Sequence, residues 1–183
     1  MSIKGARPNE ARIAPHLLVS DGERALQFYA AAFGASVLFR SPMPGGNGIH
    51  AQIRIAESTV LITTVGFASD GAHPGIGSPE TLGGSSTILE LYVDNVDTVY
   101  QRAIDAGATA VMPLMDTFFG DRYGQLRDPF GHVWGLASVR EELPADGGGC
   151  AHAAIHGLGE FVAKAGHVRW WCGIYSSTPL RIL

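Results

Sequence analysis

Apolar and polar positions in the first part of the chain follow two different periods. A short apolar run at residues 13–19 predicts a strand, and from Asp21 onward apolar residues recur every three or four positions, which predicts an amphipathic helix that ends at Gly34. Strict alternation over residues 49–55, with apolar runs on either side, predicts three more strands. This segment is therefore predicted to form a β-α-β-β-β unit, whose last three strands cover residues 35–40, 49–55 and 59–65.

The same order of elements returns after a connector rich in Gly, Ser and Pro. A strand at 87–93 and a helix from Asp94 to Ala106 are followed by predicted strands at 109–115, 121–127 and 132–138. The two helix blocks, 21–35 and 94–108, align without a gap and both end in Gly-Ala. Chance similarity of two amphipathic helices is the competing interpretation, but the matching element order favours an internal repeat. The sequence thus predicts an α+β fold of two tandem βαβββ modules at 11–65 and 86–143, with a linker loop at 66–85 and a C-terminal extension at 144–183.

Composition excludes several classes of protein. The chain has 183 residues, of which 46% are hydrophobic, so it can bury a core and is not globally disordered. Its net charge of −4 and the absence of a basic run speak against nucleic acid as a partner. The apolar runs are of strand length, far short of the roughly 18–20 residues of a membrane helix, and the N-terminus lacks the apolar segment of a signal peptide. We therefore expect no membrane partner and a cytoplasmic protein. Both cysteines, Cys150 and Cys172, lie near the C-terminus, which argues against a disulfide scaffold.

Two motifs carry a resemblance to a known family. A Phe-Tyr pair at 28–29 precedes Phe-Gly-Ala at 33–35, and the second module ends in Asp-Pro-Phe-Gly-His at 128–132. With the tandem βαβββ order, these residues resemble the vicinal oxygen chelate superfamily, which includes glyoxalase I, bleomycin-resistance proteins and extradiol dioxygenases. The segment Phe-Gly-Asp-Arg-Tyr-Gly at 119–124 is most similar to its PhnB-like branch. The resemblance covers residues 11–143 and implies the glyoxalase/bleomycin resistance fold, a cup-shaped mixed sheet with helices outside and the ligand inside.

Strand parity indicates which side chains line this cup, because successive residues of a strand point to opposite faces. In the opening strand of the second module, the apolar positions 89, 91 and 93 suit the helix side, which leaves Ile88, Glu90 and Tyr92 for the cup. In the first module, positions 17 and 19 suit the helix side, which leaves Ala14, His16 and Leu18. His16 and Glu90 are therefore predicted at comparable places in the two repeats.

The resemblance also implies a divalent metal ion, held by one His or Glu side chain from each of four strands. Carried over by position, these four sites fall on residues that cannot bind a metal: Ala14, Ile62, Ile88 and Gly135. We therefore expect no cofactor. An alternative is a displaced site in which His16, His50 and Glu90 hold Zn, Ni, Mn or Fe. His16 and Glu90 could instead form a buried hydrogen-bonded pair, bind polar groups of a ligand, or act as catalytic acid and base.

Aromatic and polar residues near the predicted cup favour a flat ligand. Phe119, Arg122 and Tyr123 fall in one short segment, and aromatic faces beside a guanidinium suit a conjugated or anionic molecule. An ion pair between Asp121 and Arg122 is the competing interpretation. His50 and Gln52 share one strand face, either in the cup or toward solvent. The predicted ligand-binding residues are thus His16, His50, Gln52, Glu90, Tyr92, Phe119, Arg122 and Tyr123.

The leading hypothesis is a metal-independent protein of the glyoxalase/bleomycin-resistance type that sequesters a small aromatic or conjugated molecule, including an antibiotic, as a homodimer. The alternative is an enzyme, a glyoxalase-like lyase or a dioxygenase, with a displaced site at His16, His50 and Glu90. A third hypothesis is a cup filled by the protein's own side chains. The cup closes either within one chain or by exchange of modules between two. The C-terminal extension is predicted to dock on an exposed edge or a dimer partner, or to be an addition outside the fold.

Overall fold

The computed structural model describes residues 13–65 and 75–141. The chain divides into two compact units, residues 1–142 and 143–183, and every described residue belongs to the first unit. The C-terminal extension, both cysteines and the first part of the predicted linker lie outside the described residues. Within the described ranges no helix is long and apolar enough to cross a membrane.

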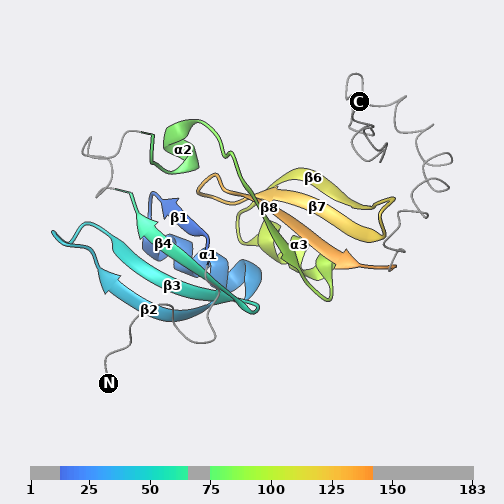
Figure 1. Cartoon of the computed structure of the whole chain (residues 1–183), viewed down its shortest axis with the longest axis horizontal. Coiled ribbons are helices and arrows are strands. Elements are labelled where there is room, and N and C mark those ends of the chain that lie inside the picture. Colours follow the sequence, from blue (N-terminus) through green and yellow to red (C-terminus); the bar gives the residue numbers. More distant parts are fainter. Residues whose placement is uncertain (1–12, 66–74, 142–183) are drawn as a thin grey trace, which may run out of the picture. The chain divides into compact units, whose positions relative to one another are not determined.

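Two βαβββ modules make up the described part of the chain, as the periodicity predicted (Figure 1). The first module contains β1 (His16–Val19), α1 (Gly22–Phe33), β2 (Ser36–Pro42), β3 (Ile49–Ile55) and β4 (Ser58–Thr64), and its sheet has the order β1-β4-β3-β2. The second contains β5 (Ile88–Tyr92), α3 (Val96–Asp105), β6 (Thr109–Asp116), β7 (Asp121–Arg127) and β8 (Val133–Val139), in the order β5-β8-β7-β6. In each sheet the opening strand is parallel to the closing strand, and the other pairs are antiparallel. A short helix, α2 (Pro79–Leu82), lies in the segment between the modules.

Local sequence signals explain where the two longer helices begin and end. The side chain of Asp21 accepts a 3.1 Å hydrogen bond from the backbone N–H of Arg24, and Asn95 accepts one of 3.0 Å from Thr98, so each helix has an N-cap. Helix α1 ends at Gly34, which adopts a left-handed conformation with φ of 69° that glycine favours. The predicted helix bounds therefore follow from capping chemistry as well as from periodicity.

Each sheet has one face covered by its own module's helix. Helix α1 packs on β3 and β4, and α3 packs on β6, β7 and β8. Burial alternates along β3 and β4, where Ala51, Ile53 and Ile62 face the helix and are almost fully buried. The alternate residues of the same strands point to the opposite face of each sheet, and most of them are exposed or half-buried. We call it the open face of that module.

The two modules share one aromatic core where α1 contacts α3. Trp134 of β8 is buried against Phe33 and Tyr29 of α1, with ring centroids 4.7 and 5.7 Å apart. Trp134 thus packs against α1, the helix of the other module. Arg102 of α3 donates a 2.7 Å hydrogen bond from Nε to the carbonyl of Ala32, one of the last carbonyl groups of α1. The two modules are therefore joined by both apolar and polar contacts.

Candidate functional site

Two imidazoles and a hydroxyl meet on the open face of the first module. Nε2 of His16 and Nδ1 of His50 each lie 2.8 Å from Oγ1 of Thr63, and the two rings are 5.8 Å apart in an edge-on arrangement. These residues come from β1, β3 and β4, whose register places them side by side. A hydroxyl has one proton, so Thr63 can donate to only one of the two rings and must accept from the other. The group therefore forms a polar chain across three strands.

The pKa of His16 lies below its ordinary value. Partial burial disfavours the charged ring, and the nearby His50 disfavours it further. At neutral pH His16 is therefore a neutral imidazole, able to accept or donate a hydrogen bond. Gln52 follows His50 on the same face of β3 and is half-buried.

The open face of the second module carries a different set of polar groups. The hydroxyl of Tyr123 donates a 3.1 Å hydrogen bond to Oε1 of Glu90, and Nε2 of Gln125 donates one of 2.9 Å to the Tyr123 oxygen. The hydroxyl of Tyr92 lies 3.3 Å from Oδ2 of Asp121 and donates to it. Since β8 lies between β5 and β7, each tyrosine reaches across β8 to a carboxylate on the far strand.

Gly135 provides the space that the Glu90 carboxylate occupies. A Cβ at this position would lie 2.1 Å from Oε2 of Glu90 and 2.6 Å from the Tyr123 oxygen, closer than real Cβ contacts. By position, Gly135 of β8 corresponds to the metal-binding Glu that the resemblance implies. The side chain of Glu90, its neighbour on β5, lies over this glycine. The open face of the second module therefore does carry a carboxylate here, supplied from β5 instead of β8.

Both tyrosines remain protonated at neutral pH. Burial raises the pKa of Tyr92, and so does the neighbouring Asp121 carboxylate. The pKa of Tyr123 is also raised, mainly by burial. Each phenol is therefore held as a hydrogen-bond donor to its carboxylate.

Arg122 does not belong to this face. Its guanidinium forms 2.7–3.0 Å hydrogen bonds to Asp97 of α3 and a 3.2 Å bond to Asp116. It therefore lies on the helix side of β7 and does not share the open face with Tyr123, its strand neighbour, which points the opposite way. Ligand binding by Arg122 stays a prediction that this position does not favour. The alternative ion pair with Asp121 does not form, since the partners of Arg122 are Asp97 and Asp116.

Phe119 lies in the turn between β6 and β7, where it packs edge-on against Phe118 and is 45% exposed. Strand parity does not apply to a turn, so the sequence places Phe119 near the cup only because Arg122 and Tyr123 follow in the same short segment. Of the predicted ligand-binding residues, His16, His50 and Gln52 lie on the first open face. Glu90, Tyr92 and Tyr123 lie on the second.

Neither the family positions nor the displaced set gives a metal site within one chain. Ile88 and Gly135 lie on the open face, but Ile62 is fully buried on the helix side, where the open-face neighbours are Leu61 and Thr63. Within residues 13–65 and 75–141 no three His, Cys, Asp or Glu side chains are placed to hold a metal ion. His16 and His50 are thus brought together, but Glu90 does not join them in a single chain.

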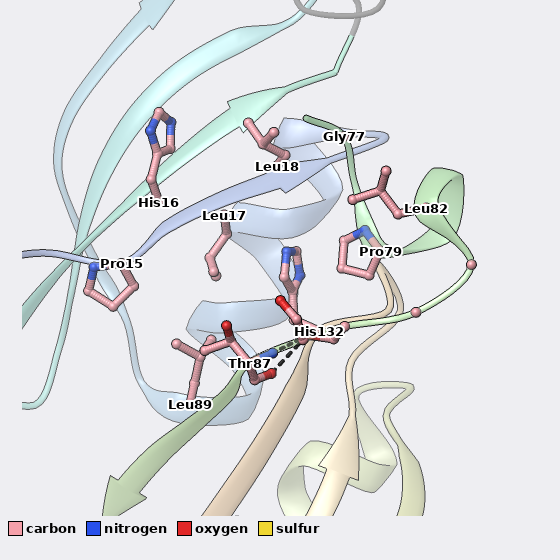
Figure 2. Close-up of a pocket in the computed structure, with 14 residues that line it drawn as sticks. Pro15, His16, Leu17, Leu18, Gly77, Pro79, Leu82, Thr87, Leu89 and His132 are labelled. Carbon is pink, nitrogen blue, oxygen red and sulfur yellow. Dashed lines mark hydrogen bonds between the residues drawn. The ribbon is translucent and has the colours of Figure 1, made fainter. Parts of the chain in front are cut away.

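A pocket of about 680 Å³ lies between β1 and the segment that leads from α2 into β5. Figure 2 shows Leu17 pointing to the side on which His132 lies, whereas His16 and Leu18 point the other way. The His132 side chain is nearly buried in this wall, with Nδ1 3.3 Å from Asp128. Among the predicted ligand-binding residues only His16 borders this pocket, so the pocket shares this one residue with the polar group of the first open face and none with that of the second.

Three residues of these faces were missed by the sequence interpretation: Thr63, Asp121 as the partner of Tyr92, and Gln125. Asp121 and Gln125 share the strand parity of Tyr123, so parity applied along β7 places them on the open face, whereas no ligand-binding residue is predicted on β4, the strand of Thr63. The residues with which they form hydrogen bonds, by contrast, depend on the register between strands.

The comparisons with known proteins agree with the fold. The family model "Glyoxalase/Bleomycin resistance protein/Dioxygenase superfamily" matches residues 11–136. The uncharacterized protein Mb0911c of Mycobacterium bovis is 42% identical over 137 residues, which cover 75% of this chain and 89% of that protein. TioX from Micromonospora sp. ML1 is 26% identical with a TM-score of 0.56, over 70% of this chain and 98% of TioX. The fosfomycin resistance protein FosX from Mesorhizobium loti is similar in fold alone, at 17% identity and a TM-score of 0.50 over 73% of this chain and 94% of FosX.

The narrower PhnB-like assignment stays a prediction. The family match spans both βαβββ modules and contains all the open-face strands except the last residues of β8. The chain therefore belongs to the glyoxalase/bleomycin resistance protein/dioxygenase superfamily.

Proposed function

We propose that this protein binds a small aromatic or conjugated molecule on its open sheet faces, without a metal ion, and acts by sequestering it. The observation that carries the proposal is the pair of tyrosines on the second module. Tyr92 is 59% exposed, yet its hydroxyl is held by Asp121, and Tyr123 is held by Glu90. Ordered aromatic side chains facing solvent are typical of a surface that stacks on a ligand.

Large apolar side chains surround these polar groups and support a homodimer. Ile88 and Val139 of the second open face are 46% and 56% exposed, and Phe39 beside the first open face is 50% exposed. Apolar patches of this kind on soluble proteins mark binding surfaces. A second copy would cover them if the open face of one copy's first module met that of the partner's second module.

The charges of the two open faces are compatible with this pairing. The first face carries the guanidinium of Arg54 beside neutral His16, whereas the second carries the carboxylates of Glu90 and Asp121. Faces of opposite charge attract each other, whereas two copies of the same face repel each other. The ligand would then lie between an imidazole-lined wall and a tyrosine-lined wall, which corresponds to a cup closed by two chains.

Two measurements on the purified full chain test the proposal. Native mass spectrometry should show a dimer, with a small organic molecule bound to part of it when the protein is taken directly from cells. Titration with a panel of flat aromatic compounds should quench tyrosine fluorescence and saturate at one ligand per protomer, equally with and without EDTA. A monomer that binds none of the panel would refute the proposal, and binding that EDTA abolishes would refute its metal-free part.

A further inference from the structure

We infer that the second open face selects flat cations, which it holds by two tyrosine–carboxylate pairs that span β8 over a floor of small residues. This inference rests on the proposed function and specifies its ligand. The cation-binding group is defined by Glu90, Tyr92, Asp121 and Tyr123, with Gly135 and Ala137 beneath them.

The first step is the geometry of the two phenols. Tyr92 extends from β5 across β8 to Asp121 at the start of β7, and Tyr123 extends from β7 across β8 to Glu90 on β5. The two rings therefore lie across the same strand in opposite directions. Register places both tyrosines beside Ala137, so they flank one position of the sheet.

The second step is the floor beneath the rings. Ala137 is only 1% exposed although it lies on the open face, because larger side chains from both neighbouring strands cover it. Gly135 has no side chain, and the Glu90 carboxylate lies where a Cβ would be. Larger residues on β8 would lift the rings and the carboxylate away from the sheet. The small residues thus let the polar groups lie low and leave their outer faces accessible.

The third step is the uncompensated negative charge. Asp121 is 9% exposed, and among the described residues its carboxylate accepts a side-chain hydrogen bond only from Tyr92 and forms no ion pair. Glu90 likewise has no cationic partner in the described part of the chain, and its hydrogen bond from Tyr123 uses Oε1. The Asp121 carboxylate is nearly buried, whereas Glu90 is exposed. A buried carboxylate is stabilised by a counter-charge, which no side chain within residues 13–65 and 75–141 supplies to Asp121.

The nearest arginines do not fill this role. Arg122 points to the helix side, where it pairs with Asp97. Arg127 lies on the open face two residues along β7 from the level of Glu90, but the two side chains form no ion pair. Among the described residues of the same chain no side chain supplies this positive charge, whereas a ligand cation would supply it, and electron-rich tyrosine rings favour a cation as well through cation–π attraction.

Three flat tricyclic probes of different charge test the inference: proflavine as the cation, acridone as the neutral compound and acridine-9-carboxylate as the anion. We expect proflavine to bind the full-length protein about tenfold more tightly than acridone, with the anion weakest. Glu90→Gln should lower proflavine affinity by about tenfold and leave acridone affinity within about twofold. The Tyr92→Leu variant should weaken both compounds, because it removes a ring.

Glu57→Gln is the matched control, since it makes the same change of charge in the exposed β3–β4 turn of the other module. It should leave proflavine affinity within about twofold of wild type, because exposed charges this far apart are screened at physiological salt. Circular dichroism confirms that each variant is folded.

The outcomes separate this inference from the proposed function. Equal binding of the three probes, or loss of proflavine affinity in Glu57→Gln equal to that in Glu90→Gln, would overturn the selection for cations while the protein remained an aromatic-binding protein. Binding of none of the probes would overturn the inference as well. The proposed function would fail only if the copurified protein also carried no ligand and the aromatic panel gave no saturable quenching.

Discussion

The Tyr29 hydroxyl of α1 donates a 2.7 Å hydrogen bond to Oδ2 of Asp128, ninety-nine residues further along the chain. The same oxygen accepts a 3.0 Å bond from Nε1 of Trp134, and Oδ1 accepts bonds of 2.9 Å from the backbone N–H groups of Phe130 and His132. Four donors thus saturate one buried carboxylate. The Asp-Pro-Phe-Gly-His turn is therefore the polar link between the two modules, and Asp128 is structural, not catalytic.

Removing this link should destabilise the fold. Tyr29→Phe deletes one hydrogen bond to a buried charge and should lower the free energy of unfolding by about 1.5–3 kcal/mol. Asp128→Ala leaves four donors without an acceptor and should cost at least about 3 kcal/mol. Urea denaturation followed by circular dichroism measures both changes. Tyr100→Phe is the control, because its hydroxyl donates to the neutral carbonyl of Met112 and its loss should cost about 1 kcal/mol. Equal losses in the two Tyr→Phe variants would contradict the assigned role of Asp128.

Acid should weaken the same link. Burial acts to raise the pKa of Asp128, but the nearby His132 and the hydrogen bonds from Tyr29 and Trp134 outweigh it, so the pKa lies below its ordinary value. The unfolded chain therefore binds the proton more readily than the folded protein. This stabilisation is complete above about pH 4 and is lost as the pH falls through the folded-state pKa. The difference in unfolding free energy between wild type and Asp128→Asn should accordingly shrink below about pH 4. A difference that stayed constant would mean that Asp128 is not held ionised.

A methyl group at position 135 should disturb the second open face. Gly135→Ala would place Cβ against the Glu90 carboxylate and the Tyr123 hydroxyl, which must both move. We expect a loss of about 1–3 kcal/mol in unfolding free energy, with weaker binding of aromatic ligands. Gly84→Ala is the control, since no atom lies within 4 Å of the added carbon. Unchanged ligand affinity in a folded Gly135→Ala variant would remove Glu90 and Tyr123 from the binding surface.

Arg122 should matter for stability and not for binding. Arg122→Met removes the ion pairs with Asp97 and Asp116, whose carboxylates are exposed, so we expect a small, salt-sensitive fall in melting temperature. Affinity for aromatic ligands should stay within about twofold of wild type, because the guanidinium lies on the helix side of the sheet. A large loss of affinity would show that Arg122 reaches the ligand after all.

His16 should titrate at a higher pH when His50 is replaced. Burial is the main cause of the lowered pKa of His16, and the neighbouring His50 is the second. His50→Gln removes the second cause and should move the pKa of His16 upward, though burial should keep it below its ordinary value. Nuclear magnetic resonance of the imidazole protons follows this titration. Arg54→Gln provides a comparison, because it removes a positive charge further along the same strand. An equal shift in both variants would contradict a specific His16–His50 contact.

The fold could be predicted to a large extent because it depends on periodicity and capping. Helix α1 begins after the Asp21 cap and ends at Gly34, as expected from residue types alone. The first strand is the exception, since it was predicted from residue 13 and begins at His16. Pro15 has no N–H for the ladder, and only its carbonyl bonds to β4.

The site was harder to predict, for two physical reasons. Arg122 and Tyr123 were assigned to one surface because they are adjacent in sequence, yet adjacent strand residues point to opposite faces. The pairs His16–Thr63 and Tyr92–Asp121 depend on the register between strands, which a single sequence does not specify. Parity thus identifies candidates, and register decides which of them meet.

The polar link also shows how far the two repeats have diverged. Alignment of Asp21 with Asp94 places Tyr29 opposite Arg102, and the turn that carries Asp128 corresponds to the short β3–β4 turn of the first module. Tyr29 and Arg102 hence occupy equivalent helix positions, but one donates to the Asp128 carboxylate and the other to the carbonyl of Ala32. The ancestral symmetry survives in the backbone and is lost in these bonds. A chimera with two copies of the first half would lack Asp128 and Arg102, and one with two copies of the second half would lack Tyr29 and Ala32, so the halves are no longer interchangeable.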